Sequence, residues 1–512
     1  MRSTVLVRTA TLFAALGGLV LPALFSLGYT SDSIELLAAV ALVAALAVIA
    51  GAATAILPQR AFNMVCAAIA VVSTEIYLGL HLGPEAVIGI SICLMVLGLV
   101  LVEGFAPMIA AASMASLGVA ALNRPVFIRH ETPLSQVQST LPTVIHVILD
   151  EYGAHDSFPS HLVPPATTAA MDRWFQERGF VHARRAYSDE EWTQRSIARV
   201  LNPQTHDVLD VLRKDDKTAI STWSLQTSSA LNDIAAMRRP AVASSSYFNI
   251  AAALETSTAR GPVTIYNYGV PSPTLGLSGM GAADRFRVMG ALVSSWLYWR
   301  QKVMPYHNWL AYTDVGRFVF RWQQAKDRLH PLTSRLMLEE VTRKQIPQLG
   351  RGEYLLVHVL LPHHPYVFDR SCRLRPVDQW LNPFRWPDDD TMADRARRYP
   401  LYAEQIECTL TLVDQLLGAI DRNPSLRDAT VILHGDHGSR IGMKDWKKYA
   451  AEGYSEQASL LDWHATLFAV RFADRKARTV DRPISLPDAM DHLVKQDFTT
   501  FDDAKLPTRD SG

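Results

Sequence analysis

Charged residues are scarce between Val5 and Leu122, where the chain consists mostly of Ala, Leu, Val, Ile and Gly. An apolar helix of about 20 residues is long enough to cross a bilayer. The pattern predicts a membrane domain over residues 1–122, with helices at about 6–28, 35–57, 62–82, 86–103 and 106–122. After residue 122 the composition becomes that of a water-soluble protein, so the 512 residues divide into a membrane part and a larger polar part.

The number of crossings decides on which side of the membrane the polar part lies. The last two apolar segments form one tract, interrupted at residues 103–107 by Glu-Gly-Phe-Ala-Pro. Four spans would return the polar part to the cytoplasm, whereas five would place it outside. The tract is longer than one crossing requires and its Gly and Pro allow a turn, which favours five spans. Arg2, Arg8 and Arg60 then lie on the cytoplasmic side.

The sequence therefore predicts a multi-pass protein of a bacterial inner membrane, with its polar part on the periplasmic, external side. A cleavable signal peptide is the alternative for the first apolar segment. It requires a small-residue cleavage site followed by polar mature sequence. Further apolar segments follow here instead, which favours an uncleaved anchor.

The charges of the whole chain balance, with 50 basic and 50 acidic residues, so no nucleic-acid partner is expected. Residues 123–141 are polar and contain two prolines, which predicts a linker. We expect residues 142–498 to form one domain and residues 499–512 to form a polar tail.

Beyond the linker, short apolar runs alternate with stretches of helical periodicity. Strands are expected at 144–149, 263–267, 354–361 and 430–434, and a helix from Tyr402 to Ile420. The segment 275–345 is expected to be mostly helical. The order of strand, helix and strand predicts an α/β domain with a mainly parallel central sheet and helices on both faces.

Two of these strands end in residues that bind metals. The run 430–434 is followed by Gly435-Asp436-His437-Gly438, and the run 144–149 by Asp150-Glu151. Open α/β sheets place their sites at the carboxyl ends of strands, and carboxylate with imidazole suits zinc or manganese. The glycines would let the backbone turn sharply and a ligand approach closely. Either end alone is also explained by a turn or a helix cap, but two in one domain look like two halves of a metal site.

Thr193 lies between these two strand ends in the sequence. Ser188 or Asp189 is expected to cap a helix with an acidic first turn, and Thr193 would lie near its start. Backbone N–H groups there favour an anionic group, and contact with a divalent cation would make the hydroxyl a competent nucleophile. The alternative is an ordinary threonine at a helix start.

Histidines lie in and directly after the expected strands. His363 and His364 follow the run 354–361 within a Pro-His-His-Pro sequence. Imidazoles at this place bind substrate phosphate, protonate a leaving group or ligate a metal. His146 and His358 lie inside apolar runs and are expected to be core histidines.

The four cysteines fall into two pairs. Cys66 and Cys93 lie within expected membrane spans, where they serve as small packing residues. Cys372 and Cys408 lie in the polar part, where an oxidising compartment would permit a disulfide. Sequence alone leaves their pairing open.

Taken in order, these motifs resemble those of the alkaline phosphatase and sulfatase superfamily over about residues 142–470. The resemblance rests on strand-Asp150-Glu151, the Thr193-x-x-Ser196 helix start, Pro-His-x-Pro and strand-Gly-Asp436-His437-Gly. Within the superfamily the chain looks like the membrane-anchored branch of lipoteichoic acid synthases, phosphoethanolamine transferases and phosphoglycerol transferases. Those enzymes carry several N-terminal spans and an external catalytic domain.

The resemblance implies an alkaline-phosphatase-like α/β fold and an enzyme that holds one or two divalent ions of zinc, manganese, magnesium or calcium. Thr193 matches the nucleophile and His363 the catalytic histidine of the substrate site. His364 and Arg440 match substrate-binding positions. The implied metal ligands are the residues of the strand ends and the nucleophile: Asp150, Glu151, Thr193, Asp436 and His437.

The expected function is transfer of a phospholipid head group, phosphoglycerol or phosphoethanolamine, through a phospho-threonine. The donor is a membrane phospholipid and the acceptor a glycan or a lipid. Formylglycine sulfatases need a C/S-x-P-x-R motif that this sequence lacks at Thr193, and the related transferases often carry one Glu where this chain has Asp150-Glu151. Two alternatives stay open. One is a sulfatase-like hydrolase acting on phosphodiesters or sulfuric esters, and the other is a non-catalytic membrane sensor or scaffold.

Overall fold

The computed structural model describes residues 2–63 with gaps at 28, 30–32 and 55, residue 66, and residues 140–215, 222–255, 264–268, 277, 280–302, 329–380 and 391–507, except residues 246 and 444. Two compact units are present. The first contains residues 1–126, 270–327 and 381–384, and the second contains the rest of the chain.

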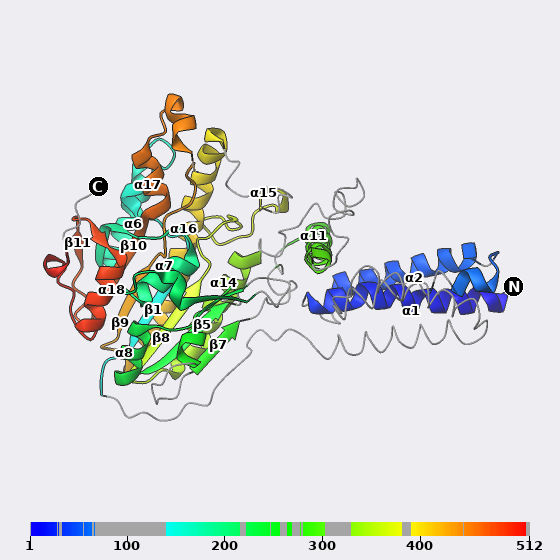
Figure 1. Cartoon of the computed structure of the whole chain (residues 1–512), viewed down its shortest axis with the longest axis horizontal. Coiled ribbons are helices and arrows are strands. Elements are labelled where there is room, and N and C mark those ends of the chain that lie inside the picture. Colours follow the sequence, from blue (N-terminus) through cyan, green and yellow to red (C-terminus); the bar gives the residue numbers. More distant parts are fainter. Residues whose placement is uncertain are drawn as a thin grey trace. The chain divides into compact units, whose positions relative to one another are not determined.

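In the first unit, helices α1 (Arg2–Ser26) and α2 (Ile34–Thr54) lie side by side (Figure 1). Gly51 brings α2 so close to α1 that an added Cβ would lie 3.0 Å from Thr9 Cα, an approach that small residues allow. Among the described residues, α2 is the one helix both long and apolar enough to cross a membrane. A signal sequence or a buried core helix has the same length and composition.

The helices expected at 6–28 and 35–57 correspond to α1 and α2. The expected spans at 62–82, 86–103 and 106–122 lie almost entirely outside the described residues, as does Cys93. A multi-pass topology therefore stays a prediction.

Helix α11 (Ala282–Lys302) belongs to the first unit and contacts both α1 and α2. The guanidinium of Arg285 meets the buried carboxylate of Glu35 in two hydrogen bonds of 2.6 and 2.8 Å. Such a paired geometry makes the contact specific. The first part of the helical segment expected at 275–345 thus packs with the N-terminal helices.

The second unit is built on one large sheet with the strand order β11-β2-β10-β9-β1-β8-β5-β7, and β12 pairs with β2 (Figure 1). Neighbouring strands are parallel except that β10 runs antiparallel to both β2 and β9. The prediction of a mainly parallel sheet is confirmed. The strands are β1 (Val144–Leu149), β2 (Val181–Tyr187), β5 (Arg239–Ser245), β7 (Thr264–Tyr268), β8 (Glu353–Val359), β9 (Thr430–His434), β10 (Ala465–Arg471), β11 (Arg478–Val480) and β12 (Ile484–Ser485).

The central strands are buried on both faces, which explains their continuous apolar sequences. Val144, Ile148 and Ile432 join one hydrophobic cluster with helices α7 (Thr193–Leu201), α8 (Ser229–Met237) and α18 (Leu486–Lys495). The alternate residues Ile145 and Val147 are equally buried and point to the opposite face. Helices therefore cover the sheet on both sides, as predicted.

The remaining elements complete this unit. They are α6 (Pro165–Glu177), α9 (Ala252–Glu255), α14 (His330–Glu340), the π-helical turn Val341–Gln345, α15 (Val377–Trp380), α16 (Met392–Arg422), α17 (Glu456–His464), and a small sheet of β3 (Leu212–Asp215), β4 (Thr222–Leu225) and β6 (Phe248–Asn249). Helix α16 begins ten residues before its predicted start at residue 402. A capping box between Thr391 and Asp394 satisfies the N–H groups of its first turn and explains the early start.

The end of the chain packs onto this unit further than the sequence suggested. Phe501 and Leu506 are buried in the same hydrophobic cluster as α18, and Phe501 meets Phe468 at a ring distance of 5.3 Å. Residues 499–507 therefore belong to the domain rather than to a polar tail, because two apolar side chains anchor them.

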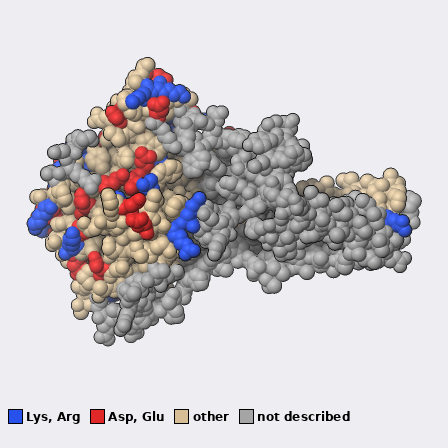
Figure 2. All heavy atoms as spheres, viewed as in Figure 1, with Lys and Arg blue, Asp and Glu red and all other residues tan. Residues whose placement is uncertain are grey.

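Acidic and basic side chains are interspersed over the described residues on the face shown in Figure 2. Ion pairs of the described residues include Arg178 with Asp414 at 2.5 Å and Arg184 with Asp156 at 2.7 Å. Such a mixed surface agrees with the balanced composition of the sequence.

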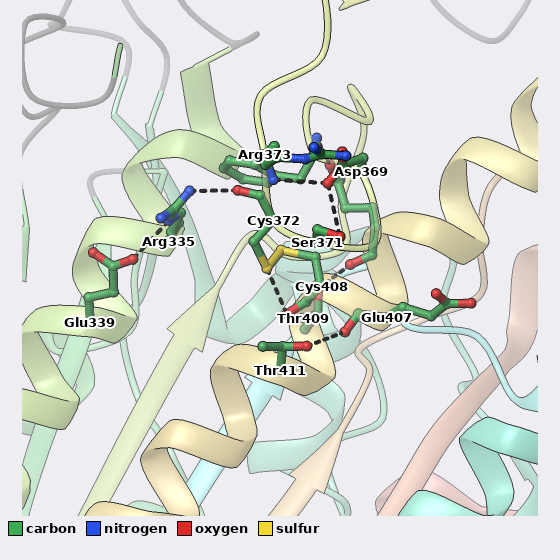
Figure 3. The surroundings of a disulfide bond; sticks show 12 residues. Arg335, Glu339, Asp369, Ser371, Cys372, Arg373, Glu407, Cys408, Thr409 and Thr411 are labelled. Atoms are coloured by element: carbon green, nitrogen blue, oxygen red, sulfur yellow. Dashed lines mark hydrogen bonds and ion pairs between the residues drawn. A yellow bond between two sulfur atoms is a disulfide. The ribbon is translucent and has the colours of Figure 1, made fainter. Parts of the chain in front are cut away.

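Cys372 and Cys408 form a disulfide that ties the segment after β8 to helix α16 (Figure 3). The guanidinium of Arg335 donates a hydrogen bond of 2.9 Å to the Cys372 carbonyl, and the Cys372 N–H donates to the Asp369 carbonyl. The bond closes a loop with a sequence separation of 36 residues. The pairing that the sequence left open is thus present.

Replacing both Cys372 and Cys408 by alanine is expected to lower the free energy of unfolding by about 2–4 kcal/mol, because the unfolded chain loses a crosslink. Thermal unfolding of the purified protein checks this result. Cys66→Ala removes a free, buried thiol and is the matched control. A reductant should change the melting temperature of this variant as much as it changes that of the wild type. A double variant that melts at the wild-type temperature would contradict the prediction.

Candidate active site

The two predicted ligand-bearing strands lie next to each other in the sheet. Strands β1 and β9 are parallel, with Ile148 opposite His434, so both end at the same edge. Asp150 and Asp436 follow directly, and the Glu151 N–H donates a hydrogen bond of 2.9 Å to Asp436 Oδ1. Residues separated by 285 positions in the chain therefore meet where the sequence predicted a site.

Gly435 and Gly438 frame the Asp436-His437 turn because the backbone leaves no room for a side chain. An added Cβ at Gly435 would collide with the Tyr152 carbonyl, and one at Gly438 would lie 2.8 Å from the backbone carbon of Asp462. The glycines thus permit close approach, as expected. The approaching group is the chain's own backbone.

The first cluster consists of Asp150, Asp436 and His437, whose ligand atoms all lie within 4.8 Å of one another. All three side chains are fully buried. The Thr193 hydroxyl lies 3.3 Å from Asp150 Oδ2 and 3.2 Å from His437 Nε2. The structure therefore brings together four of the five predicted metal ligands, including the predicted nucleophile.

Helix α7 begins at Thr193 itself, so the expected cap at Ser188 or Asp189 is wrong. The Ser188 hydroxyl bonds instead to the Glu190 backbone and to the Ser196 hydroxyl, at 3.0 and 2.9 Å. The acidic residues 189–191 thus form a turn before the helix. Trp192 occupies the cap position without a side-chain bond, and Thr193 is the first helical residue.

Two carboxylate oxygens in this cluster have no hydrogen-bond partner among the described residues: Asp150 Oδ1 and Asp436 Oδ2. A buried, unpaired carboxylate oxygen is costly unless a cation meets it. Two carboxylates, an imidazole and a hydroxyl are also ligand types that zinc and related divalent ions accept. The residues therefore fit a divalent metal.

The pKa values of the two carboxyl groups in this cluster also suit a bound divalent metal. Burial, followed by the neighbouring Asp436 carboxylate, raises the pKa of Asp150 to about 7. Burial also opposes ionisation of Asp436, but His437 and the Glu151 N–H lower its pKa below the usual value. A divalent cation between the two carboxylates would stabilise both in their ionised forms.

Glu151 faces a second cluster together with His363, His364 and Arg440. Its carboxylate accepts a 3.0 Å hydrogen bond from the His364 N–H and lies 3.1 Å from His364 Nδ1. His363 Nε2 and Arg440 Nη1 lie 3.6 Å from the same carboxylate. Glu151 has a left-handed backbone, with φ of 62°, which sends its side chain away from that of Asp150.

This second cluster holds Glu151 in its charged form. Burial opposes its ionisation, but His363, His364 and Arg440 together lower its pKa well below the usual value. Burial lowers the pKa of His363 to about 4 against the opposing effect of Glu151. The Glu151 carboxylate therefore lies with His363 and His364, apart from Asp150, Asp436 and His437, in a second group that could hold a metal.

Arg440 is held by aromatic rings on two sides. Its guanidinium lies 4.6 Å from the Trp192 ring and 5.8 Å from the Trp463 ring. Trp192 is 40% exposed and directly precedes Thr193. An exposed aromatic ring thus adjoins both the predicted nucleophile and the predicted phosphate-binding arginine.

Sequence reasoning missed several residues that support these clusters. The Ser196 hydroxyl donates to the Asp436 carbonyl, and Tyr402 Oη donates to the Glu151 carbonyl at 2.5 Å while accepting from the Gly153 N–H at 2.8 Å. Asp462 accepts two hydrogen bonds from Arg395. Ser196 belongs to the Thr193-x-x-Ser196 motif, but its contact with Asp436 was not predicted. Tyr402, Arg395 and Asp462 come from distant helices, so no local pattern identified their roles.

His358 differs from the expectation that it is only a core histidine. It is fully buried in β8, as expected, but its Nε2 lies 3.2 Å from Asp150 Oδ2. His146 meets Tyr354 and His434 at 2.5 and 2.6 Å and remains within the core. The register of β8 against β1 decides the difference, because it places His358 beside the end of β1.

His358→Phe is expected to weaken metal binding about 10–100-fold, because a hydrogen-bond partner that orients a ligand is lost. The check is titration of chelator-treated protein with zinc. His358→Gln keeps an N–H donor on a flexible side chain and should recover part of the affinity. Equal zinc affinity in the wild type and the phenylalanine variant would rule out the positioning role.

Comparisons with known proteins give structural matches only. No protein-family model matches the chain, and no curated protein matches it. The C-terminal periplasmic domain of EcEptC from Escherichia coli, in complex with zinc, is 11% identical, with a TM-score of 0.40 over 73% of this chain and 88% of that one. The phosphonate monoester hydrolase of Agrobacterium radiobacter is 13% identical, with a TM-score of 0.38 over 69% and 73%.

A third similar structure is the integral membrane lipooligosaccharide phosphoethanolamine transferase EptA from Neisseria meningitidis. It is 13% identical, with a TM-score of 0.35 over 94% of each chain. Because these identities and TM-scores are low, the assignment of the site rests on the residues of this chain alone. The four motifs that resemble those of the alkaline phosphatase and sulfatase superfamily meet at one edge of a mainly parallel sheet.

Proposed function

We propose that this protein is a membrane-anchored, metal-dependent phosphotransferase that moves a phospholipid head group to a glycan or lipid acceptor. One observation carries the proposal. The Thr193 hydroxyl lies 3.3 Å from Asp150 Oδ2 and 3.2 Å from His437 Nε2, in a cluster where Asp150 Oδ1 and Asp436 Oδ2 accept no hydrogen bond from the described residues. A hydroxyl at a site built for a cation is the arrangement that nucleophilic catalysis requires.

Asp150, Asp436, His437 and the Thr193 oxygen would hold a divalent metal. When bound, the metal lowers the pKa of the hydroxyl and offsets negative charge on the phosphate. Glu151 with His363 and His364 offers a second set of ligand atoms, which lie within 4.8 Å of one another. One or two ions, of zinc, manganese, magnesium or calcium, are compatible with these ligands.

In the first half of the reaction, Thr193 Oγ1 attacks the phosphorus of a phosphodiester. A P–O bond forms to Thr193 and the P–O bond to diacylglycerol breaks. The hydroxyl gives up one proton, and the diacylglycerol oxygen takes up one. We assign the transfer of that proton to His363, and the binding of the phosphate oxygens to Arg440 and His364.

In the second half, a hydroxyl of the acceptor attacks the same phosphorus. The bond between phosphorus and Thr193 breaks, the acceptor loses its proton, and Thr193 regains one. Phosphoglycerol or phosphoethanolamine is then attached to the acceptor. The exposed Trp192 ring, next to Thr193, suits a sugar acceptor that stacks on an aromatic face.

The location follows from the same proposal. A lipid donor requires a membrane anchor, and α2 has the length and composition for one. The disulfide between Cys372 and Cys408 supports an oxidising compartment such as the periplasm. Five spans over residues 1–122 would place the catalytic domain there, on the outer side of a bacterial inner membrane.

The proposal is tested with the full-length protein in lipid nanodiscs that contain labelled phosphatidylglycerol or phosphatidylethanolamine. Transfer predicts that diacylglycerol release beyond one equivalent per enzyme requires an added glycan or lipid acceptor, and that the label appears on the acceptor. Release at the same rate without any acceptor would instead make the protein a phosphodiesterase. If no head group is released under either condition, the phospholipid-donor proposal is wrong.

A further inference from the structure

A third cluster of metal-binding residues lies outside the candidate active site. It consists of His155 in the turn after Glu151, Asp172 on α6 and His182 on β2. The ligand atoms of these three residues lie within 4.8 Å of one another. We propose that His155, Asp172 and His182 form a separate metal site that takes zinc and fixes the turn following Asp150 and Glu151.

The strongest observation is the buried imidazole of His182, which is only 1% exposed. Its Nε2 has no hydrogen-bond partner among the described residues. Its Nδ1 faces Asp172 Oδ1 at 3.8 Å, too far for a hydrogen bond. A buried imidazole with few polar contacts is costly, and a cation at Nδ1 would give the ring one polar partner while Nε2 stays without a hydrogen bond among the described residues.

The distances suit a small ion. With zinc–ligand bonds of about 2.0–2.1 Å, tetrahedral geometry separates neighbouring ligand atoms by about 3.3 Å. The two observed separations from Asp172 Oδ1 lie on either side of this value, at 2.6 Å for His155 Nδ1 and 3.8 Å for His182 Nδ1. The Asp172 side chain is 18% exposed, so it has room to shift between the two imidazoles.

The protonation states suit a metal as well. Burial, followed by the neighbouring His155, lowers the pKa of His182 to about 3, so its imidazole is neutral, the form that binds metal. Burial opposes ionisation of Asp172, but His155, His182 and Arg184 lower its pKa. Two imidazoles and a carboxylate are a set that zinc accepts, with a fourth position left for water.

The neighbouring side chains meet the second nitrogen of His155 and the second oxygen of Asp172. Tyr152 Oη lies 3.1 Å from His155 Nε2, so it accepts the ring N–H when Nδ1 binds metal. Arg184 Nε lies 3.6 Å from Asp172 Oδ2, the oxygen turned away from the imidazoles. Arg184 is also hydrogen-bonded to Asp156 at 2.7 Å, which draws part of its charge away from the site.

The fold explains why a metal here would matter. His182 stacks on Phe175 of α6 at a ring distance of 4.6 Å, so α6, β2 and the turn at 152–158 converge on this cluster. The Tyr152 carbonyl also accepts hydrogen bonds from Leu467 and Thr466. A metal would clamp the segment that leads out of Asp150-Glu151 without touching substrate.

The test is the zinc content of the full-length, detergent-purified protein after chelator treatment, exposure to excess zinc and desalting. Asp172→Asn and His182→Phe should each hold one zinc fewer per chain than the wild type. The asparagine retains the shape of aspartate, and the phenylalanine retains the stack on Phe175. Asp156→Asn removes a neighbouring carboxylate that lies outside the cluster and is the matched control, with unchanged zinc content.

The same loss should appear when Asp172→Asn is added to a protein that already carries Asp436→Asn. This background separates the two sites, because it lacks a ligand of the candidate active site and can be inactive while still binding the proposed zinc. Zinc should also raise the melting temperature of the wild type more than that of Asp172→Asn. The proposal is overturned if Asp172→Asn and His182→Phe both have the zinc content and the zinc-dependent melting shift of the wild type.

Discussion

Thr193→Ala is expected to lower head-group transfer by at least about 10³-fold, since the variant lacks the atom that forms the bond to phosphorus. The hydroxyl it removes lies 3.3 Å from Asp150 Oδ2 and 3.2 Å from His437 Nε2. Loss of the hydroxyl and one methyl group at the first residue of α7 should leave the fold intact. The measurement is the rate of diacylglycerol release from labelled phospholipid in the presence of acceptor.

Thr193→Ser is the matched control, because it keeps the hydroxyl and removes only the methyl group. It should retain a substantial part of the activity. Ser196→Ala, three residues along the same helix, tests whether the other hydroxyl of the motif is chemically required. Its side chain donates to the Asp436 carbonyl and is expected to act through position only. If Thr193→Ala releases diacylglycerol at the wild-type rate, Thr193 is not the nucleophile.

The second large effect is expected for Asp436→Asn, which should lower metal affinity by more than the 10–100-fold typical of residues that only orient a ligand. Asp436 Oδ1 accepts the N–H groups of Glu151 and His437, each at 2.9 Å, and asparagine can keep both bonds. Oδ2 accepts no hydrogen bond from the described residues and lies 3.2 Å from His437 Nε2, and an amide there supplies neither charge nor a strong ligand.

Zinc affinity and transfer activity should therefore fall together in Asp436→Asn while the melting temperature of the chelator-treated protein changes little. Asp189→Asn is the matched control, because Asp189 is an exposed carboxylate in the turn before α7. It should leave both quantities unchanged. If Asp436→Asn binds zinc at the candidate active site as tightly as the wild type, the ligand assignment fails.

The predictable parts of the fold were those with a strong local pattern. Strands β1 and β9 have continuous apolar sequences and occur where predicted, at 144–149 and 430–434. Strand β2 carries His182, Arg184 and Arg185 among its apolar residues, and β5 opens with Arg-Pro before small residues. Neither sequence reads as a buried strand, because pairing with neighbours rather than local preference determines both.

The candidate site was predictable where a strand end carries its ligands. Asp150, Asp436 and His437 were identified in this way, and the structure places them together. His358 was assigned to the core only, since its contact with Asp150 depends on the register between β1 and β8. The cluster of His155, Asp172 and His182 joins three separate elements, so no sequence spacing revealed it.

The most direct test of the account is the identity of the residue that carries the transferred group. Full-length protein is mixed with labelled phosphatidylglycerol or phosphatidylethanolamine without acceptor, quenched in acid, digested and mapped by mass spectrometry. The account predicts one added head-group phosphate on Thr193, which disappears when acceptor is supplied before the quench. The label on another residue, or transfer to the acceptor with no labelled protein at any time, would contradict it.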